Sequence, residues 1–185
     1  TQFDLASGTS VRFKTNESSS EIEYVPTENA LLLSSYGLIN HLNLKTKEET
    51  LLLKINPDLK LMAVSPDGEL LVAFLYSKSA LLFDLKNRKE IGSLGGLFSG
   101  HGWDIYGTKF SEDSQVIVTQ SRGDFCIWNR AGDLIRKIET SLASLDVFRG
   151  DIITLDSSGE IRVYDLAGTL SYELATGPVG SDKGA

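Results

Sequence analysis

The chain has 185 residues, of which 41% are hydrophobic and 23% charged, and its net charge is -7. This composition is typical of a folded protein with one hydrophobic core, and it excludes a disordered or fibrous chain. The acidic balance argues against non-specific binding to nucleic acid, and no apolar run approaches the roughly 18 residues of a membrane-spanning helix.

Residues 1–13 have the pattern of two short strands. They contain Phe3-Asp4, the first copy of a recurring mark in which an aromatic or apolar residue precedes Asp or Asn. Four longer units and a Gly-rich tail follow, at 20–53, 59–94, 103–139, 143–174 and 175–185. The mark recurs in each unit, at intervals of 36 to 45 residues: Leu42-Asn43, Phe83-Asp84, Trp128-Asn129 and Tyr164-Asp165. A repeat of about 40 to 45 residues is typical of four-stranded propeller blades.

Unit 59–94 shows the pattern most clearly, because four short apolar segments alternate with turn residues. Ser65-Pro66-Asp67-Gly68 predicts the first hairpin turn, since proline fixes φ and glycine permits a positive φ. Strands this short form only marginally stable sheets when isolated, so we expect the sheets to stack and bury both faces. The sequence therefore predicts an all-β fold.

The units resemble the blades of WD-repeat β-propellers. Ser65-Pro66-Asp67-Gly68 matches the first hairpin turn of that family, Trp128-Asn129 matches the end of its third strand, and Gly100-His101 matches its Gly-His pair. The resemblance covers nearly the whole chain. It implies a β-propeller of four-stranded antiparallel blades, with four complete blades and an N-terminal half blade.

The resemblance also implies a buried polar set of His, Ser or Thr, Asp and Trp in a blade. His101, Thr119 and Trp128 occupy plausible places for three of its members. The position six residues before the tryptophan holds Arg122, however, and Asp124 lies two residues further along. We therefore expect blades held together mainly by apolar packing.

The number of blades is unusual, since members of the family usually close a ring of about seven. Three explanations remain open: a piece of a longer propeller, an arc completed by a partner chain or segment, and two arcs that pair with each other. An open arc leaves a blade face and sheet edges uncovered, which natural proteins usually protect.

Protein binding is the function that the resemblance implies, with partners recognised by loops at one end of the blades. Trp103 lies in a loop ahead of a blade, where an aromatic side chain can anchor an interface, although it could equally pack between blades. The expected partner-binding residues are this loop and the second turn of each blade: Tyr36, Lys78, His101, Trp103, Asp104, Arg122 and Glu160.

The third turns carry a basic rim on this acidic chain. It consists of Lys45, Lys47, Lys86, Arg88, Lys89 and Arg130. Such a rim could bind a phosphoinositide, another anionic surface or a phosphopeptide, although lysines in turns also protect sheet edges from pairing. Phe148-Arg149-Gly150 resembles in part the lipid-binding Phe-Arg-Arg-Gly of certain propellers, without the second arginine.

Catalytic and metal-binding motifs are not apparent. Two histidines 60 residues apart and one cysteine offer no short-spaced ligand pair, and no phosphate loop or nucleophile elbow is present. We therefore expect a non-catalytic scaffold without cofactor that mediates protein-protein interaction and complex assembly; the other alternative is a fragment of a larger catalytic propeller. Because Cys126 is the sole cysteine, an intracellular, cytoplasmic location is favoured, with other proteins as partners, peripheral membrane contact open and no nucleic acid expected.

Overall fold

The computed structural model describes residues 2–4, 9–11, 21–55, 59–75, 80–94 and 105–175. Within these residues the chain forms 18 strands and no helix. The strands make one two-stranded sheet and four four-stranded sheets, and all neighbouring strands are antiparallel. This confirms the predicted all-β class and the division into four units of four strands.

The two-stranded sheet pairs β1 (Gln2–Asp4) with β2 (Thr9–Val11). Sheet 1 contains β3 (Glu21–Val25), β4 (Ala30–Ser35), β5 (Leu38–Asn43) and β6 (Glu49–Lys54). Sheet 2 contains β7 (Leu59–Val64), β8 (Leu70–Leu75), β9 (Ala80–Asp84) and β10 (Lys89–Ser93). Sheet 3 contains β11 (Gly107–Phe110), β12 (Val116–Gln120), β13 (Asp124–Asn129) and β14 (Leu134–Glu139). Sheet 4 contains β15 (Leu142–Phe148), β16 (Asp151–Asp156), β17 (Glu160–Asp165) and β18 (Leu170–Ala175).

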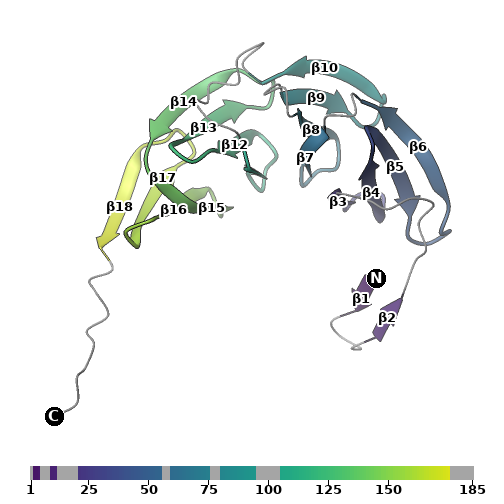
Figure 1. Cartoon of the computed structure of the whole chain (residues 1–185), viewed down its shortest axis with the longest axis horizontal. Coiled ribbons are helices and arrows are strands. Elements are labelled where there is room, and N and C mark those ends of the chain that lie inside the picture. Colours follow the sequence, from purple (N-terminus) through teal and green to yellow (C-terminus); the bar gives the residue numbers. More distant parts are fainter. Residues whose placement is uncertain are drawn as a thin grey trace.

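The four sheets lie side by side along an open arc (Figure 1). The first strand of each sheet lies on the inner side of the arc and the fourth strand on the outer side. Contacts between neighbouring sheets accordingly join β3 to β7, β7 to β11 and β11 to β15. Sheets 1 and 4 therefore end the arc of four-stranded sheets.

The hydrophobic core consists of three layers, one at each junction between neighbouring sheets. Leu32 and Phe83 belong to the layer between sheets 1 and 2, and Phe74 and Trp128 to the layer between sheets 2 and 3. Phe125 belongs to the layer between sheets 3 and 4. Because the middle sheets are covered on both faces, every residue of β8 is buried.

The recurring mark of the sequence lies at the end of the third strand of each four-stranded sheet. Its apolar member is buried in every case: Leu42, Phe83, Trp128 and Tyr164. The recurring mark therefore identifies a buried position of each four-stranded sheet.

The turn chemistry expected for the first hairpin of sheet 2 is confirmed, since Gly68 has φ 72°. The hydroxyl of Ser65 donates to Asp67 Oδ1 at 2.5 Å and accepts from the N–H of Leu70 at 2.9 Å. Ser111 repeats both contacts in sheet 3, with Asp113 and Val116. The same turn thus closes the first hairpin of both middle sheets.

No helix in the described residues is long and apolar enough to cross a lipid bilayer.

Candidate functional site

The second turns and the connections between sheets lie at one end of the sheets, which we call the second-turn surface. The N–H of Ile55, after sheet 1, donates to the Gly37 carbonyl at 2.7 Å. The N–H of Thr140, after sheet 3, donates to the Gly123 carbonyl at 3.0 Å. The end that the sequence predicted to bind partners is therefore built from backbone held by hydrogen bonds.

Tyr36 is the most exposed large hydrophobic side chain of the described residues, with 83% of its area open to solvent. It also has φ 47°, and Gly37 beside it has φ 78°. A two-residue hairpin turn with both φ values positive matches the twist of the strands, but a bulky residue rarely occupies the first position. Strain of this kind at an exposed aromatic side chain favours a functional role for Tyr36.

Arg122 and Tyr106 lie where sheets 3 and 4 meet. Arg122 is exposed in the second turn of sheet 3, and its carbonyl accepts from the N–H of Leu142 at 3.4 Å. Tyr106 is 43% exposed, and its hydroxyl donates to the Ser121 carbonyl at 2.8 Å. Tyr106 was not predicted, because its position beside this turn depends on the packing of two sheets.

Glu160, the predicted second-turn residue of sheet 4, belongs to a charged cluster around Arg162. The guanidinium contacts Glu160, and it binds Glu173 at 2.9 Å and Asp156 at 3.4 Å. A hydrogen bond with Glu173 raises the pKa of Glu160, and burial adds to this effect. Arg162 itself was not predicted, because its partners come from three strands.

Asp156 accepts the most hydrogen bonds in this cluster. Its Oδ1 accepts from the Ser158 hydroxyl at 2.5 Å, the Ser158 N–H at 2.8 Å and the Glu160 N–H at 2.9 Å. These bonds, that from the Ser158 hydroxyl above all, lower the pKa of Asp156 to about 2. The carboxylate is therefore charged at any pH at which the protein is commonly handled.

We expect Asp156→Asn to lower the melting temperature at pH 7 and to have a smaller effect near pH 2. The pKa in the unfolded chain is about 3.9 and the folded value is lower, so the stabilisation is present above about pH 4 and is lost as the pH falls through about 2. Asn resembles the protonated acid, so the two chains should converge there. Thermal unfolding followed by circular dichroism at both pH values tests this. Equal differences at both would contradict it.

Beneath this surface, sheet 3 contains a buried polar network. The Trp128 indole N–H donates to Thr119 Oγ1 at 2.8 Å. These are two of the residues that the WD-repeat resemblance leads us to expect in a buried polar set. Asp124 is buried at the start of β13, where it accepts from the Ser121 hydroxyl at 2.6 Å and pairs with Lys137 at 3.2 Å. Asp124 therefore stabilises the second turn of sheet 3 from a position that the family pattern does not anticipate.

Of the other predicted partner-binding residues, Lys78, His101, Trp103 and Asp104 lie outside the described residues. Tyr36 and Arg122 lie in the second turns of sheets 1 and 3, and Glu160 is the first residue of β17, directly after the second turn of sheet 4. The structure thus places the three described members of the predicted surface at the same end of three different sheets, with Tyr36 and Arg122 at equivalent positions.

The first and third turns share the opposite end of the sheets. The N–H of Leu85, after the third strand of sheet 2, donates to the carbonyl of Glu69 in the first turn region at 2.9 Å. Five members of the basic rim are exposed at this end: Lys45, Lys47, Lys86, Arg88 and Lys89. Because the first turns bring carboxylates to the same end, the rim has mixed charge.

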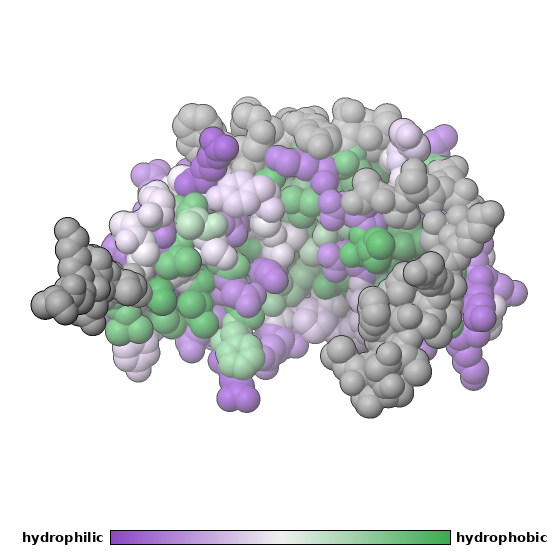
Figure 2. Space-filling view, turned by 60° about the horizontal axis from the view of Figure 1, so that its bottom comes forward, coloured by the Kyte–Doolittle hydropathy of each residue, from purple (hydrophilic) through white to green (hydrophobic). Residues whose placement is uncertain are grey.

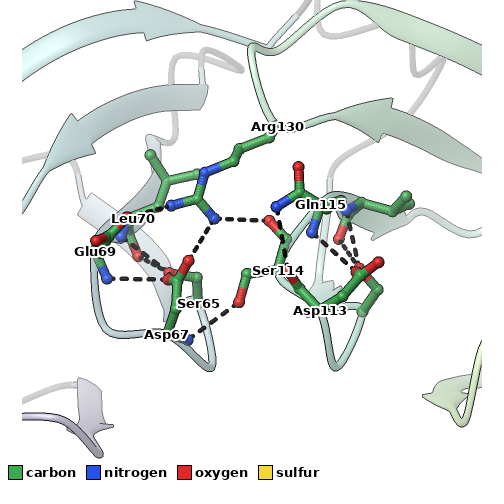
Figure 3. A network of polar contacts seen from close by, with 10 residues as sticks. Ser65, Asp67, Glu69, Leu70, Asp113, Ser114, Gln115 and Arg130 are labelled. Carbon is green, nitrogen blue, oxygen red and sulfur yellow. Dashed lines mark hydrogen bonds and ion pairs between the residues drawn. The ribbon is translucent and has the colours of Figure 1, made fainter.

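Arg130, the sixth member of the basic rim, joins sheets 2 and 3 (Figure 3). Its guanidinium binds Asp67 at 2.7 Å, Glu69 at 3.1 Å and the Ser114 carbonyl at 2.8 Å. Burial raises the pKa of Asp67, but hydrogen bonds from Ser65, Glu69 and Arg130 outweigh it and lower the value. Arg130 therefore holds the junction together, which leaves little of its charge for an external anion.

A pocket of about 360 Å³ opens beside Arg130 at this junction. It is lined by Glu69, Leu70, Asp84, Lys86, Ile91 and Arg130. Acidic and basic groups are matched in number there, so the pocket has no strong preference for an anion.

Across the parts of the chain that the structure describes, no group of three or more His, Cys, Asp or Glu side chains could hold a metal ion. Burial raises the pKa of the Cys126 thiol to about 12, so this thiol is protonated and unreactive. The described residues therefore provide surfaces for contact and no evident chemical centre.

Comparison with known proteins does not extend this description: no family model matches the chain, and no curated protein matches it.

Proposed function

We propose that the chain is a partial β-propeller of WD-repeat type that acts as a non-catalytic platform for protein assembly. The proposal is supported by four similar sheets along an arc, by the Trp128 to Thr119 hydrogen bond, and by the turn at Ser65-Pro66-Asp67-Gly68. The main support is the second-turn surface, where Tyr36, Tyr106 and Arg122 are exposed on tightly hydrogen-bonded backbone.

In the proposed mechanism of partner binding, the sheets fix the positions of the binding residues. Sheets packed against their neighbours hold the turns in place before a partner arrives, which reduces the entropy lost on association. Tyrosine and arginine supply large contact areas, and both are enriched among the residues that dominate binding energies. A protein partner with an apolar pocket and an acidic group would complement this surface.

Site-specific photo-crosslinking in cells tests the proposal. A photoreactive phenylalanine analogue at position 36 should yield adducts with discrete proteins. Position 47 is the matched control, since both are exposed turn residues with positive φ, 47° and 65°, at opposite ends of the sheets. Adducts from position 47 alone would favour the basic rim, and adducts from neither would contradict the proposal.

We expect Tyr36→Gly to abolish those interactions without destabilising the fold. Glycine adopts a positive φ without the cost of about 1–2 kcal/mol that other residues incur, so the melting temperature should stay constant or rise. Co-precipitation of the partner identified by crosslinking, together with a thermal melt, measures both effects. Normal binding by a stable Tyr36→Gly chain would remove Tyr36 from the site.

A further inference from the structure

Sheet 4 has one packed face and one face without a neighbouring sheet in the described part of the chain. Ile152 and Tyr164 are buried on the packed face, against sheet 3. The opposite side, which we call the trailing face, consists of two rows of paired residues. They are Ile153, Val163 and Tyr172, and Leu155, Ile161 and Leu174.

The trailing face is apolar and open to solvent. Ile153 is 37% exposed, Leu155 39%, Tyr172 68% and Leu174 59%. Figure 2 shows green, apolar side chains gathered over sheet 4 at the left of the view. Four large apolar side chains on one sheet face are more than scattered surface residues, and such a patch marks an interaction site.

The equivalent face of sheet 3 shows what covers such residues. Trp128 pairs with Ile117 as Tyr164 pairs with Ile152, so Val118 and Ile127 of sheet 3 correspond to Ile153 and Val163 of sheet 4. Val118, Phe125 and Ile127 are fully buried beneath sheet 4. The positions that are fully buried in sheet 3 are thus exposed at Ile153 and half-buried at Ile161 and Val163 in sheet 4.

At two of the junctions, a glycine in the third turn of one sheet lies directly against the sheet that precedes it in the chain. A Cβ on Gly168 of sheet 4 would lie 2.8 Å from Arg136 and 3.0 Å from Ile127 and Ile138 of sheet 3. A Cβ on Gly132 of sheet 3 would lie 2.8 Å from the Ser93 carbonyl oxygen and 2.9 Å from Leu82 of sheet 2. The positions that Gly168 touches on sheet 3 correspond to Val163, Tyr172 and Leu174 on the trailing face.

We propose that the trailing face of sheet 4 is a docking site for one further four-stranded antiparallel β-sheet of the same kind. This partner sheet has an aliphatic or aromatic facing side and a glycine in its third turn, which lies against Val163, Tyr172 and Leu174. The junction between sheets 3 and 4 supplies the geometry, since the new junction repeats it. This surface is separate from the second-turn surface, so either proposal can fail without the other.

The decisive test supplies such a sheet covalently. A second copy of residues 140–175 is appended after residue 175, and Leu155→Cys in the original sheet reports on coverage; the buried Cys126 adds no background labelling. Maleimide should label the thiol introduced at position 155 at least about tenfold more slowly in the extended chain, because a covered thiol reacts only when the sheets open. Equal labelling rates in the two chains would overturn the proposal, because a suitable sheet that is covalently attached next to the trailing face should pack against it and cover the thiol.

Two glycine variants in the appended copy provide a matched pair. Both Gly168 and Gly150 have positive φ, 81° and 86°, but a Cβ on Gly150 meets nothing within 4 Å. Alanine at the appended Gly168 should restore fast labelling, and alanine at the appended Gly150 should not. Equal effects would overturn the role of the third turn. Labelling of the 185-residue chain that slows as its concentration rises would instead assign the face to pairing of two copies.

A second measurement uses the 185-residue chain itself. If the trailing face is an interface, Tyr172→Thr with Leu174→Thr should reduce binding of an apolar fluorescent dye and shift the melting temperature by only about 3 °C. Ile152→Thr, on the packed face of the same sheet, should lower it several times more. If the trailing-face substitutions destabilise the chain as much as Ile152→Thr, these residues hold sheet 4 together and the proposal is wrong.

Discussion

Trp128→Ala should destabilise the chain by about 3–5 kcal/mol, the range measured for aromatic truncations in tightly packed cores. Trp128 is fully buried in the layer between sheets 2 and 3, where Phe74 and Leu82 pack around it. Removing the indole leaves a cavity between two sheets and takes away the N–H that donates to Thr119 Oγ1. For a chain of this length the melting temperature should fall on the order of 10 °C.

Urea denaturation of Trp128→Ala, Trp128→Phe and Tyr172→Ala measures this effect against two controls. Trp128→Phe keeps most of the apolar volume but loses the hydrogen bond, so a loss of about 1–3 kcal/mol is expected. Tyr172→Ala removes an aromatic ring that is 68% exposed and should stay within about 0.5 kcal/mol of the parent chain. If Trp128→Ala were no more destabilising than Tyr172→Ala, the layer between sheets 2 and 3 would not be a core.

The strands and turns could be predicted because their causes are local. Proline and glycine in Ser65-Pro66-Asp67-Gly68 define a hairpin by stereochemistry, and Gly68 has the positive φ expected of it. The recurring mark could be recognised because Phe83, Trp128 and Tyr164 occupy the same buried position in successive sheets. Because the unit repeats, each local pattern occurs several times along the chain, and each occurrence supports the same prediction.

Contacts between sheets could not be predicted, because they join residues that are far apart in the sequence. The relative positions of these residues depend on how the sheets stack. Arg130 was assigned to a basic rim on its own turn, yet its carboxylate partners Asp67 and Glu69 belong to the previous sheet. Asp124 was noted only as displaced from a family position, and its partner Lys137 comes from the next strand. Sequence alone therefore identified charged turn residues without distinguishing those that are paired from those that are free to bind.

Glycines illustrate the same limit. Gly132 and Gly150 both follow turn patterns in the sequence, and both have positive φ, 93° and 86°. Gly132 also lies against the neighbouring sheet, whereas a Cβ on Gly150 would meet nothing within 4 Å. The turn chemistry predicts the backbone conformation of both residues, and the close approach at Gly132 follows only from the stacking of sheets 2 and 3.

Gly132→Ala should therefore be the more damaging of two otherwise similar substitutions. A positive φ costs a non-glycine residue about 1–2 kcal/mol, and this cost applies to Gly132→Ala and Gly150→Ala alike. At Gly132 the new Cβ would also lie 2.8 Å from the Ser93 carbonyl oxygen and 2.9 Å from Leu82. Backbone cannot move aside as a flexible side chain can, so a further cost of about 1–3 kcal/mol, typical of overpacking, is expected.

Gly92→Ala provides the baseline for this comparison, since its Cβ would meet nothing within 4 Å and no positive φ is involved. It should change the free energy of unfolding by less than about 0.5 kcal/mol. Urea denaturation of the three variants should give the order Gly92→Ala, Gly150→Ala, Gly132→Ala, from least to most destabilised. Equal losses at Gly132 and Gly150 would mean that sheets 2 and 3 separate at this turn without cost. Only the close approach of Gly168, between sheets 3 and 4, would then support the tight junction from which we infer a further docking sheet.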